Sequence, residues 1–211
     1  MKIESAKLRY RPVTMDDQAS LKVALSDWTH DNTYKGRSAR FTDQRIYNTL
    51  DKWVSDMEVE PYEAPLTSSS SYRQALAAYL DSTSSVSSPP GSETVVGVVV
   101  FVAKGKEIIF ESGAIHPSYR RGGLYTEVYT TMGHYCFRTL QADSLVWKIP
   151  QSVSPPQTIQ SKFSDYITKT GEEAGKTETN NAYTITKAQF ASREADSSGA
   201  AEKALKYEFT A

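Results

Sequence analysis

Residues 94–103 read TVVGVVVFVA, an almost unbroken run of apolar side chains, most of them β-branched. Such a run predicts a strand buried on both faces, because β-branched residues suit the pleated backbone and neither side of the run is polar. The short turn 104–106 separates it from a second strand-like run, residues 107–115, so the two strands should pair antiparallel. A sheet buried in this way needs helices on both of its faces.

A basic glycine turn follows the second strand directly. Residues 116–125 read HPSYRRGGLY and open a helical pattern whose apolar face is Leu124, Val128, Met132, Tyr135 and Cys136. The N–H groups of a helix's first turn have no intrahelical partner, and the helix dipole favours an anion beside them. Glycines in the turn remove side chains that would block close approach. The sequence therefore predicts a phosphate-binding turn.

The remaining segments predict an α+β fold in three layers. Residues 144–149 follow the helix and should lie parallel to strand 107–115, because such crossovers are right-handed. Residues 191–203 are polar and ambiguous. We expect further strands at 7–13, 182–190 and 205–209, and further helices at 14–28, 42–57, 68–80 and 158–170, the last ended by Gly171. The result is a mixed, mostly antiparallel sheet of six to seven strands.

Composition favours one domain, residues 1–211, in a reducing compartment. Residues 81–92 are nearly all Ser, Thr, Pro and Gly, which predicts a flexible insertion. The net charge of −1 provides no global field for nucleic acid or anionic membrane. The single cysteine, Cys136, excludes an intrachain disulfide, and no apolar run approaches the roughly 20 residues of a membrane helix. No signal-peptide pattern opens the chain, so we expect a cytoplasmic protein, and a homodimer is compatible with the sequence.

The histidines and the cysteine predict no metal site. His30, His116 and His134 lack the spacing of metal ligands. Cys136 lies on the apolar helix face, which is typical of a packed small hydrophobe rather than a nucleophile.

The order of elements resembles the GNAT superfamily of acyl-CoA-dependent N-acyltransferases, over roughly residues 94–175. The family signature is Gln/Arg-x-x-Gly-x-Gly/Ala, placed between a strand and a helix. Arg120 occupies its first position and Gly123 its fourth. Tyr125 occupies the position where Gly or Ala is commonest, which is a departure from the pattern.

The resemblance implies the donor and where it binds. The donor would be acetyl-CoA or another acyl-CoA, and an amine would attack its thioester directly. Strands 107–115 and 144–149 would splay apart to admit the pantetheine arm. The residues implied in cofactor binding are Ile115, Arg120, Arg121, Gly122, Gly123, Leu124 and Tyr125, with the Ile115 N–H on the thioester oxygen.

The resemblance also implies an acid and a base. Glu111 fits the base, since partial desolvation near the splay would strengthen a carboxylate in that role, but it fits a solvent-facing charge equally well. His116 is a second candidate base, and its place at a strand end suits a polar cap. Tyr166, five residues before Gly171, fits the acid that protonates the thiolate, or else packs its helix on the sheet.

Three functions remain open on these grounds. The first is an N-acyltransferase that acts on a primary amine. The second is a GNAT-fold binding or structural protein without catalysis, a reading motivated by Tyr125 and by the uncertain base. The third is another α/β phosphate binder, which the closely spaced strands 94–103 and 107–115 disfavour. The acceptor stays open among small amines, antibiotics, protein lysines, protein N-termini and nucleobases.

Overall fold

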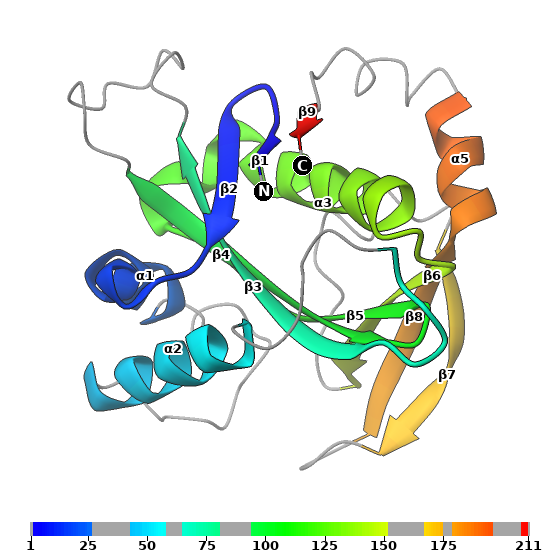
Figure 1. Ribbon diagram of the computed structural model, residues 1–211, viewed down its shortest axis with the longest axis horizontal. Helices are drawn as coiled ribbons and strands as arrows, with labels where there is room; N and C mark the ends of the chain where they lie inside the picture. The colour runs from blue at the N-terminus through cyan, green and yellow to red at the C-terminus, as the bar shows by residue number, and fades with distance from the viewer. Residues whose placement is uncertain are drawn as a thin grey trace.

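One continuous mixed sheet organises the chain (Figure 1). The computed structural model describes residues 2–26, 43–57, 65–80, 94–151, 167–174, 179–195 and 208–210. Within these residues the sheet has nine strands in the order β7-β8-β6-β5-β4-β3-β2-β1-β9. Their bounds are Lys2–Glu4 (β1), Leu8–Pro12 (β2), Ser71–Leu80 (β3), Val95–Lys104 (β4), Glu107–Ile115 (β5), Ser144–Pro150 (β6), Thr168–Ala174 (β7), Thr179–Thr186 (β8) and Glu208–Thr210 (β9).

The strand directions confirm the expected mixed topology. The pair β5 and β6 is parallel, and every other neighbouring pair among the described strands is antiparallel. The sheet is larger than the six to seven strands expected. Strands β1 and β9 pair with each other, which brings the two ends of the chain together (Figure 1).

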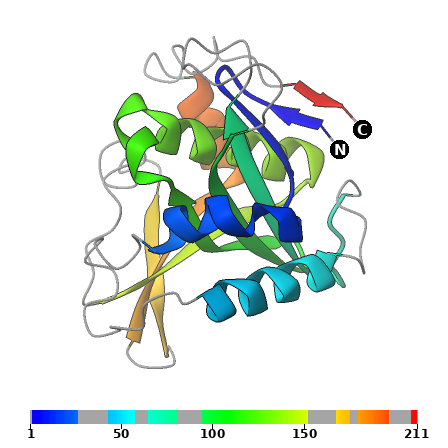
Figure 2. The ribbon, with the colours of Figure 1, turned by 90° about the vertical axis from the view of Figure 1, so that its left-hand side faces the viewer.

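Helices cover both faces of the sheet, so the three-layer arrangement is also confirmed (Figure 2). Helices α1 (Gln18–Ser26) and α2 (Asp43–Met57) lie on one face, over a core that includes Leu25 and Leu50. Helices α3 (Leu124–His134) and α5 (Lys187–Ala195) lie on the other, and α3 continues into a short π-helix, Tyr135–Thr139. The predicted apolar face of α3 is buried throughout, from Leu124 to Cys136.

The helix expected at 68–80 is wrong, because residues 71–80 form the central strand β3. The sequence SYRQALAAYL contains good helix formers, and its apolar residues recur at helical spacing. In the structure Leu76 and Ala78 join the core under α3, whereas Ala75 and Ala77 join the core under α1 and α2. Burial on both faces removes the polar alternation that marks a strand, and pairing with β2 and β4 overrides local propensity.

The C-terminal third also departs from expectation. Residues 168–170 belong to β7, and Gly171 lies inside that strand instead of ending a helix. The strand expected at 182–190 corresponds to β8 only as far as Thr186, and α5 then begins at Lys187. The rest of the helix expected at 158–170 and the Ser/Pro-rich insertion at 81–92 lie outside the described residues.

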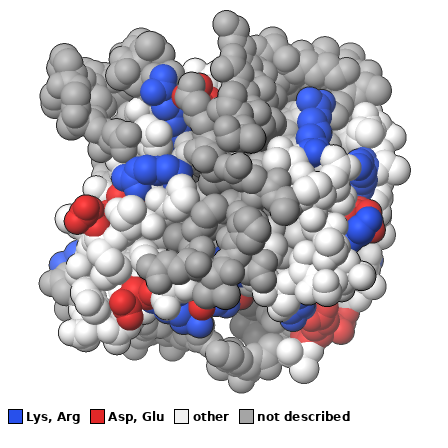
Figure 3. All heavy atoms as spheres, in the orientation of Figure 1, with Lys and Arg blue, Asp and Glu red and all other residues white. Residues whose placement is uncertain are grey.

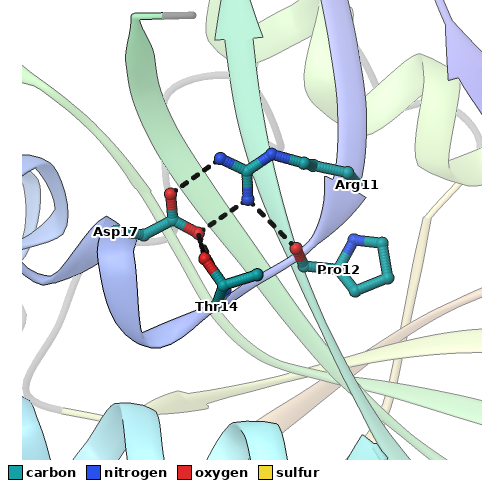
Figure 4. Close-up of polar contacts among 4 residues, drawn as sticks. All are labelled: Arg11, Pro12, Thr14 and Asp17. Carbon is teal, nitrogen blue, oxygen red and sulfur yellow. Dashed lines mark hydrogen bonds and ion pairs between the residues drawn. The ribbon is translucent and has the colours of Figure 1, made fainter.

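An ion pair joins the end of β2 to the start of the first helical segment (Figure 4). The Arg11 guanidinium donates to both carboxylate oxygens of Asp17, each at 2.8 Å. The same carboxylate accepts the N–H of Thr14 at 2.9 Å, so an acidic side chain caps the 3-10 turn Met15–Asp17 that precedes α1. Asp17 is buried, and a two-pronged, charge-assisted contact of this kind holds the strand and the helix in one geometry.

Surface charge is mixed on the face drawn in Figure 3. Among the described residues of that face, Lys and Arg side chains are interspersed with Asp and Glu, in keeping with the net charge of −1. No helix in the described ranges is long and apolar enough to cross a bilayer.

Candidate active site

A β-bulge in β5 marks the centre of the candidate site. Ser112 pairs with Val100 and Phe110 with Phe101, so Glu111 has no partner on β4. The bulge reverses the alternation of side chains along β5. Phe110 lies in the core under α3, whereas Ala114, an even number of residues later, lies in the core under α1 and α2. Bulges redirect side chains and end strand pairing, and both effects are present here.

The parallel strands β5 and β6 separate at the bulge. Their pairing begins at Glu107 and Ser144 and ends at Phe110 and Trp147. Among the described strands, the rest of β5 continues against β4 alone, and the rest of β6 continues against β8 alone. The splay expected between these strands is therefore confirmed. We call the opening between residues 111–115 of β5 and residues 148–150 of β6 the slot.

Backbone donors of β5 turn toward the slot. The His116 N–H donates to the Val96 oxygen at 2.7 Å, which defines the alternation of the antiparallel ladder between β4 and β5. The N–H groups of Gly113 and Ile115, which fall at the alternate positions, consequently point away from β4 and toward the side that β6 has left. The Ile115 N–H therefore faces the slot.

The side of the slot that faces α3 is aromatic. The rings of Phe110 and Trp147 stack with centroids 5.1 Å apart, at the point where the strands part. Tyr129 of α3 contacts both rings, and its hydroxyl lies 2.9 Å from that of Tyr125. A Cβ built on Gly113 would make ordinary van der Waals contacts, with the Tyr129 hydroxyl at 3.9 Å and the Val98 oxygen at 4.0 Å, so this position tolerates a methyl group.

The opposite side of the slot carries charged groups. Arg73 of β3 donates to both carboxylate oxygens of Glu111, at 2.8 and 3.0 Å, and also to Asp56 of α2. Hydrogen bonding to Glu111, followed by Asp56, raises the pKa of the Arg73 guanidinium above its ordinary value despite partial burial. Glu111 is exposed and ion-paired, which differs from the partly desolvated carboxylate expected from the sequence.

The signature turn is built around the end of β5. Residues Pro117–Gly122 form a 3-10 turn, and the Nδ1 of His116 accepts the Ser118 N–H at 3.2 Å, so His116 caps this turn. The Arg120 Nε donates to the Ile115 oxygen at 2.9 Å, which anchors the first signature residue to the strand. Gly123 has φ of 75°, a left-handed conformation that glycine adopts without strain.

The start of α3 has the geometry of an anion site. The Glu127 N–H donates to the Gly123 oxygen at 3.1 Å, so helical hydrogen bonding begins there. The N–H groups before it belong to the first turn, which has no intrahelical acceptors. Among the described residues, no atom lies within 4 Å of a Cβ built on Gly123, so none of them blocks the approach to this turn. These features fit a pyrophosphate group.

The structure brings several of the residues predicted from the sequence close together. Ile115, Arg120 and the backbone of Arg121, Gly122, Gly123, Leu124 and Tyr125 meet at one end of the slot, and Glu111 lies at its bulge. Tyr166 lies outside the described residues. The residues missed were Asp56, Arg73, Tyr129 and Trp147. The available signal was the charged Arg73, next to Gln74 at the start of the apolar run 75–80, and the expectation of a helix there concealed it.

No protein-family model and no curated protein matches this chain when sequences alone are compared. Solved structures, in contrast, match along nearly its whole length. The GNAT-family acetyltransferase from Bacillus anthracis is 16% identical with a TM-score of 0.61, over 89% of this chain and 99% of that one. Mycobacterium smegmatis RimJ in complex with CoA-disulfide is 14% identical with a TM-score of 0.64, over 100% and 96%.

A third similar structure is the spermidine N-acetyltransferase from Vibrio cholerae in complex with CoA and spermine. It is 10% identical with a TM-score of 0.60, over 87% of this chain and 98% of that one. The fold and the split parallel strand pair define an α+β protein with a slot beside a helix N-terminus. That fold is the fold of the GNAT acetyltransferases.

Proposed function

We propose that this chain is an acyl-CoA-dependent N-acyltransferase that transfers an acetyl group from acetyl-CoA to a primary amine. The observation that carries the proposal is the end of β5–β6 pairing at the Glu111 bulge, next to the first turn of α3. A slot between parallel strands suits a narrow, extended arm, and the adjacent helix start suits the diphosphate to which that arm is joined.

The donor-binding residues follow from the signature turn. The N–H groups of the turn and of the first helical turn, from about Arg121 to Tyr125, would hold the pyrophosphate. Arg120 supports them through its contact with Ile115. The N–H of Ile115 would donate to the thioester oxygen, because the register turns it toward the slot.

Glu111 is the proposed base. An amine reaches the thioester as a nucleophile only after it has lost its ammonium proton, and a carboxylate at the bulge can accept that proton. Arg73 holds both oxygens of this carboxylate and so fixes its position. The similar structure from Vibrio cholerae is a spermidine N-acetyltransferase, and a cationic acceptor suits a site whose proposed base, Glu111, is an exposed carboxylate.

Two measurements test this function. Calorimetry should detect binding of CoA and acetyl-CoA, and Gly123→Glu should weaken it by roughly tenfold or more. The substitution places a side chain at φ 75° and a negative charge beside a diphosphate. A thiol-release assay with a panel of amines then tests turnover. Failure of both ligands to bind would refute the proposal, and binding without turnover of any amine would favour a GNAT-fold binding protein.

The proposed location is the cytoplasm. The one cysteine, Cys136, is free and buried, and a chain without an internal disulfide needs no oxidising compartment.

A further inference from the structure

The aromatic side of the slot carries a hydroxyl group that the roles above do not use. Tyr129 is 9% exposed, and its hydroxyl lies 3.9 Å from the position of a Cβ on Gly113. Its ring lies 5.7 Å from that of Phe110 and 5.9 Å from that of Trp147, measured between centroids. These are the two residues at which the strands part. The hydroxyl therefore lies beside the opened stretch of β5, close to the bulge.

A second hydroxyl connects this group to the signature turn. The Tyr125 and Tyr129 hydroxyls are 2.9 Å apart, and either can donate to the other. Tyr125 belongs to the first turn of α3 and is only partly buried. The pair thus links the interior of the slot to its outer end, where family members usually carry Gly or Ala in place of Tyr125.

The closed end of the slot also holds a hydrogen-bond donor that lacks an acceptor. Trp147 is 5% exposed, and its indole N–H has no partner in the described part of the chain. Buried donors in folded proteins are normally paired with protein or ordered water. An unpaired donor stacked against Phe110 and beside Tyr129 is independent evidence that a ligand with polar atoms belongs here.

We propose that the Tyr129 hydroxyl hydrogen-bonds the sulfur of the donor and protonates it as the thiolate leaves, with Tyr125 resupplying the proton. This assignment rests on the proposed function. One C–N bond forms and one C–S bond breaks. The ammonium nitrogen loses two protons in all, one to Glu111 before attack and one to solvent as the amide forms, and the sulfur gains one from Tyr129. Tyr129 then takes the Tyr125 proton, and Tyr125 takes one from solvent, so the step needs no oxidant or reductant.

Binding of two ligands tests the contact without requiring an acceptor. Desulfo-CoA lacks the sulfur, so the ratio of its Kd to that of CoA measures what the sulfur contributes to binding. We expect the wild type to prefer CoA by about three- to tenfold, the effect of one hydrogen bond. Tyr129→Phe should remove this preference while it leaves the Kd of desulfo-CoA within about twofold.

Tyr135→Phe is the matched control. Tyr135 is a buried tyrosine on the continuation of α3, and its hydroxyl bonds Gln74 instead of facing the slot. Loss of the Tyr135 hydroxyl should leave the preference for CoA over desulfo-CoA unchanged. Gly113→Ala provides a second variant that leaves Tyr129 itself unchanged. Its methyl group would lie 3.9 Å from the Tyr129 hydroxyl, and it should reduce the same preference.

Turnover provides the second readout. With any amine that is acetylated, Tyr129→Phe should slow thiol release by roughly 100-fold or more, while the Kd of acetyl-CoA stays nearly constant. If the preference for CoA over desulfo-CoA persisted in Tyr129→Phe, the assignment would be overturned. If Tyr166→Phe removed that preference instead, the contact with the sulfur would belong to Tyr166. If the wild type bound neither CoA nor desulfo-CoA, the proposed function would fail first, and this inference with it.

Discussion

The two sides of the slot differ in chemistry although one strand contributes to both. The side toward α3 is formed by neutral aromatic residues, Phe110, Tyr129 and Trp147, with hydroxyl and indole groups. The side toward α2 carries the ion-paired Glu111, Arg73 and Asp56. The bulge at Glu111 creates this contrast, because it reverses the alternation of β5 at the point where β6 departs.

The contrast suggests a division of work within the slot. A thioester is neutral and tolerates an apolar surface with a few hydrogen-bond donors, whereas an ammonium ion requires carboxylates and solvent. Placing these environments on opposite sides of one strand allows the amine and the thioester to meet at the slot without sharing a binding surface.

The largest expected effect comes from replacing the proposed base, Glu111, on the charged side. Glu111→Gln should lower the rate of thiol release by roughly 100- to 10,000-fold, because the amide cannot accept the ammonium proton. The Kd of acetyl-CoA, measured by calorimetry, should change little. Glu107→Gln is the control, since Glu107 lies on the same strand within the paired region. Unchanged turnover in Glu111→Gln would exclude Glu111 as the base.

A side chain at Gly113 should close the slot from the aromatic side. Gly113→Val should weaken CoA binding roughly 10- to 100-fold, the equivalent of an overpacking cost of about 1–3 kcal/mol. The midpoint of thermal unfolding should change little, because only two atoms of the described residues lie within 4 Å of the Cβ position. Gly171→Val on β7 is the control, since its Cβ would have no neighbour within 4 Å in the part of the chain that the structure describes. Full CoA affinity in Gly113→Val would show that the ligand does not pass this residue.

Replacing Arg73, the cation between the two carboxylates, should lower the stability of the protein as well as the rate of thiol release. Arg73→Gln leaves Asp56 and Glu111 without their shared partner and should lower the free energy of unfolding by about 1–2 kcal/mol. The effect is measured by urea denaturation. Lys52→Gln is the control, because Lys52 is 63% exposed and lies 3.4 Å from Asp56. Equal losses in both variants would argue that Arg73 contributes only surface charge.

The smallest expected effect concerns the contact between α3 and α5. This contact lies outside the slot, so it serves as a comparison for the variants within the slot. Burial, with Arg138 and Arg193, lowers the pKa of His134 to about 4. The unfolded chain binds this proton near pH 6.5, so the free energy of unfolding should fall as pH drops from 6.5 to 4, and then level off. His134→Gln should remove this component, and His116→Gln should retain it. If the pH dependence persisted in His134→Gln, a group other than His134 would be its cause.

The residue pattern within a short segment predicted some secondary-structure elements correctly and others wrongly. The run at 94–103, the hairpin turn and the apolar face from Leu124 to Cys136 each lie in one short segment, and each was predicted correctly. The stretch 71–80 was not, because a strand buried on both faces carries no alternation and its Ala and Leu residues favour a helix.

The sequence by itself determined the hairpin of β4 and β5, the glycine turn and the helix start that would hold a diphosphate, because their causes are local: β-branching, glycine and unpaired first-turn N–H groups. Only the tertiary structure decided that Arg73 meets Glu111, that Tyr129 lies over Gly113, and that the β5–β6 pairing ends at a bulge. These contacts join residues far apart in the chain, and they depend on strand register, which no short segment specifies.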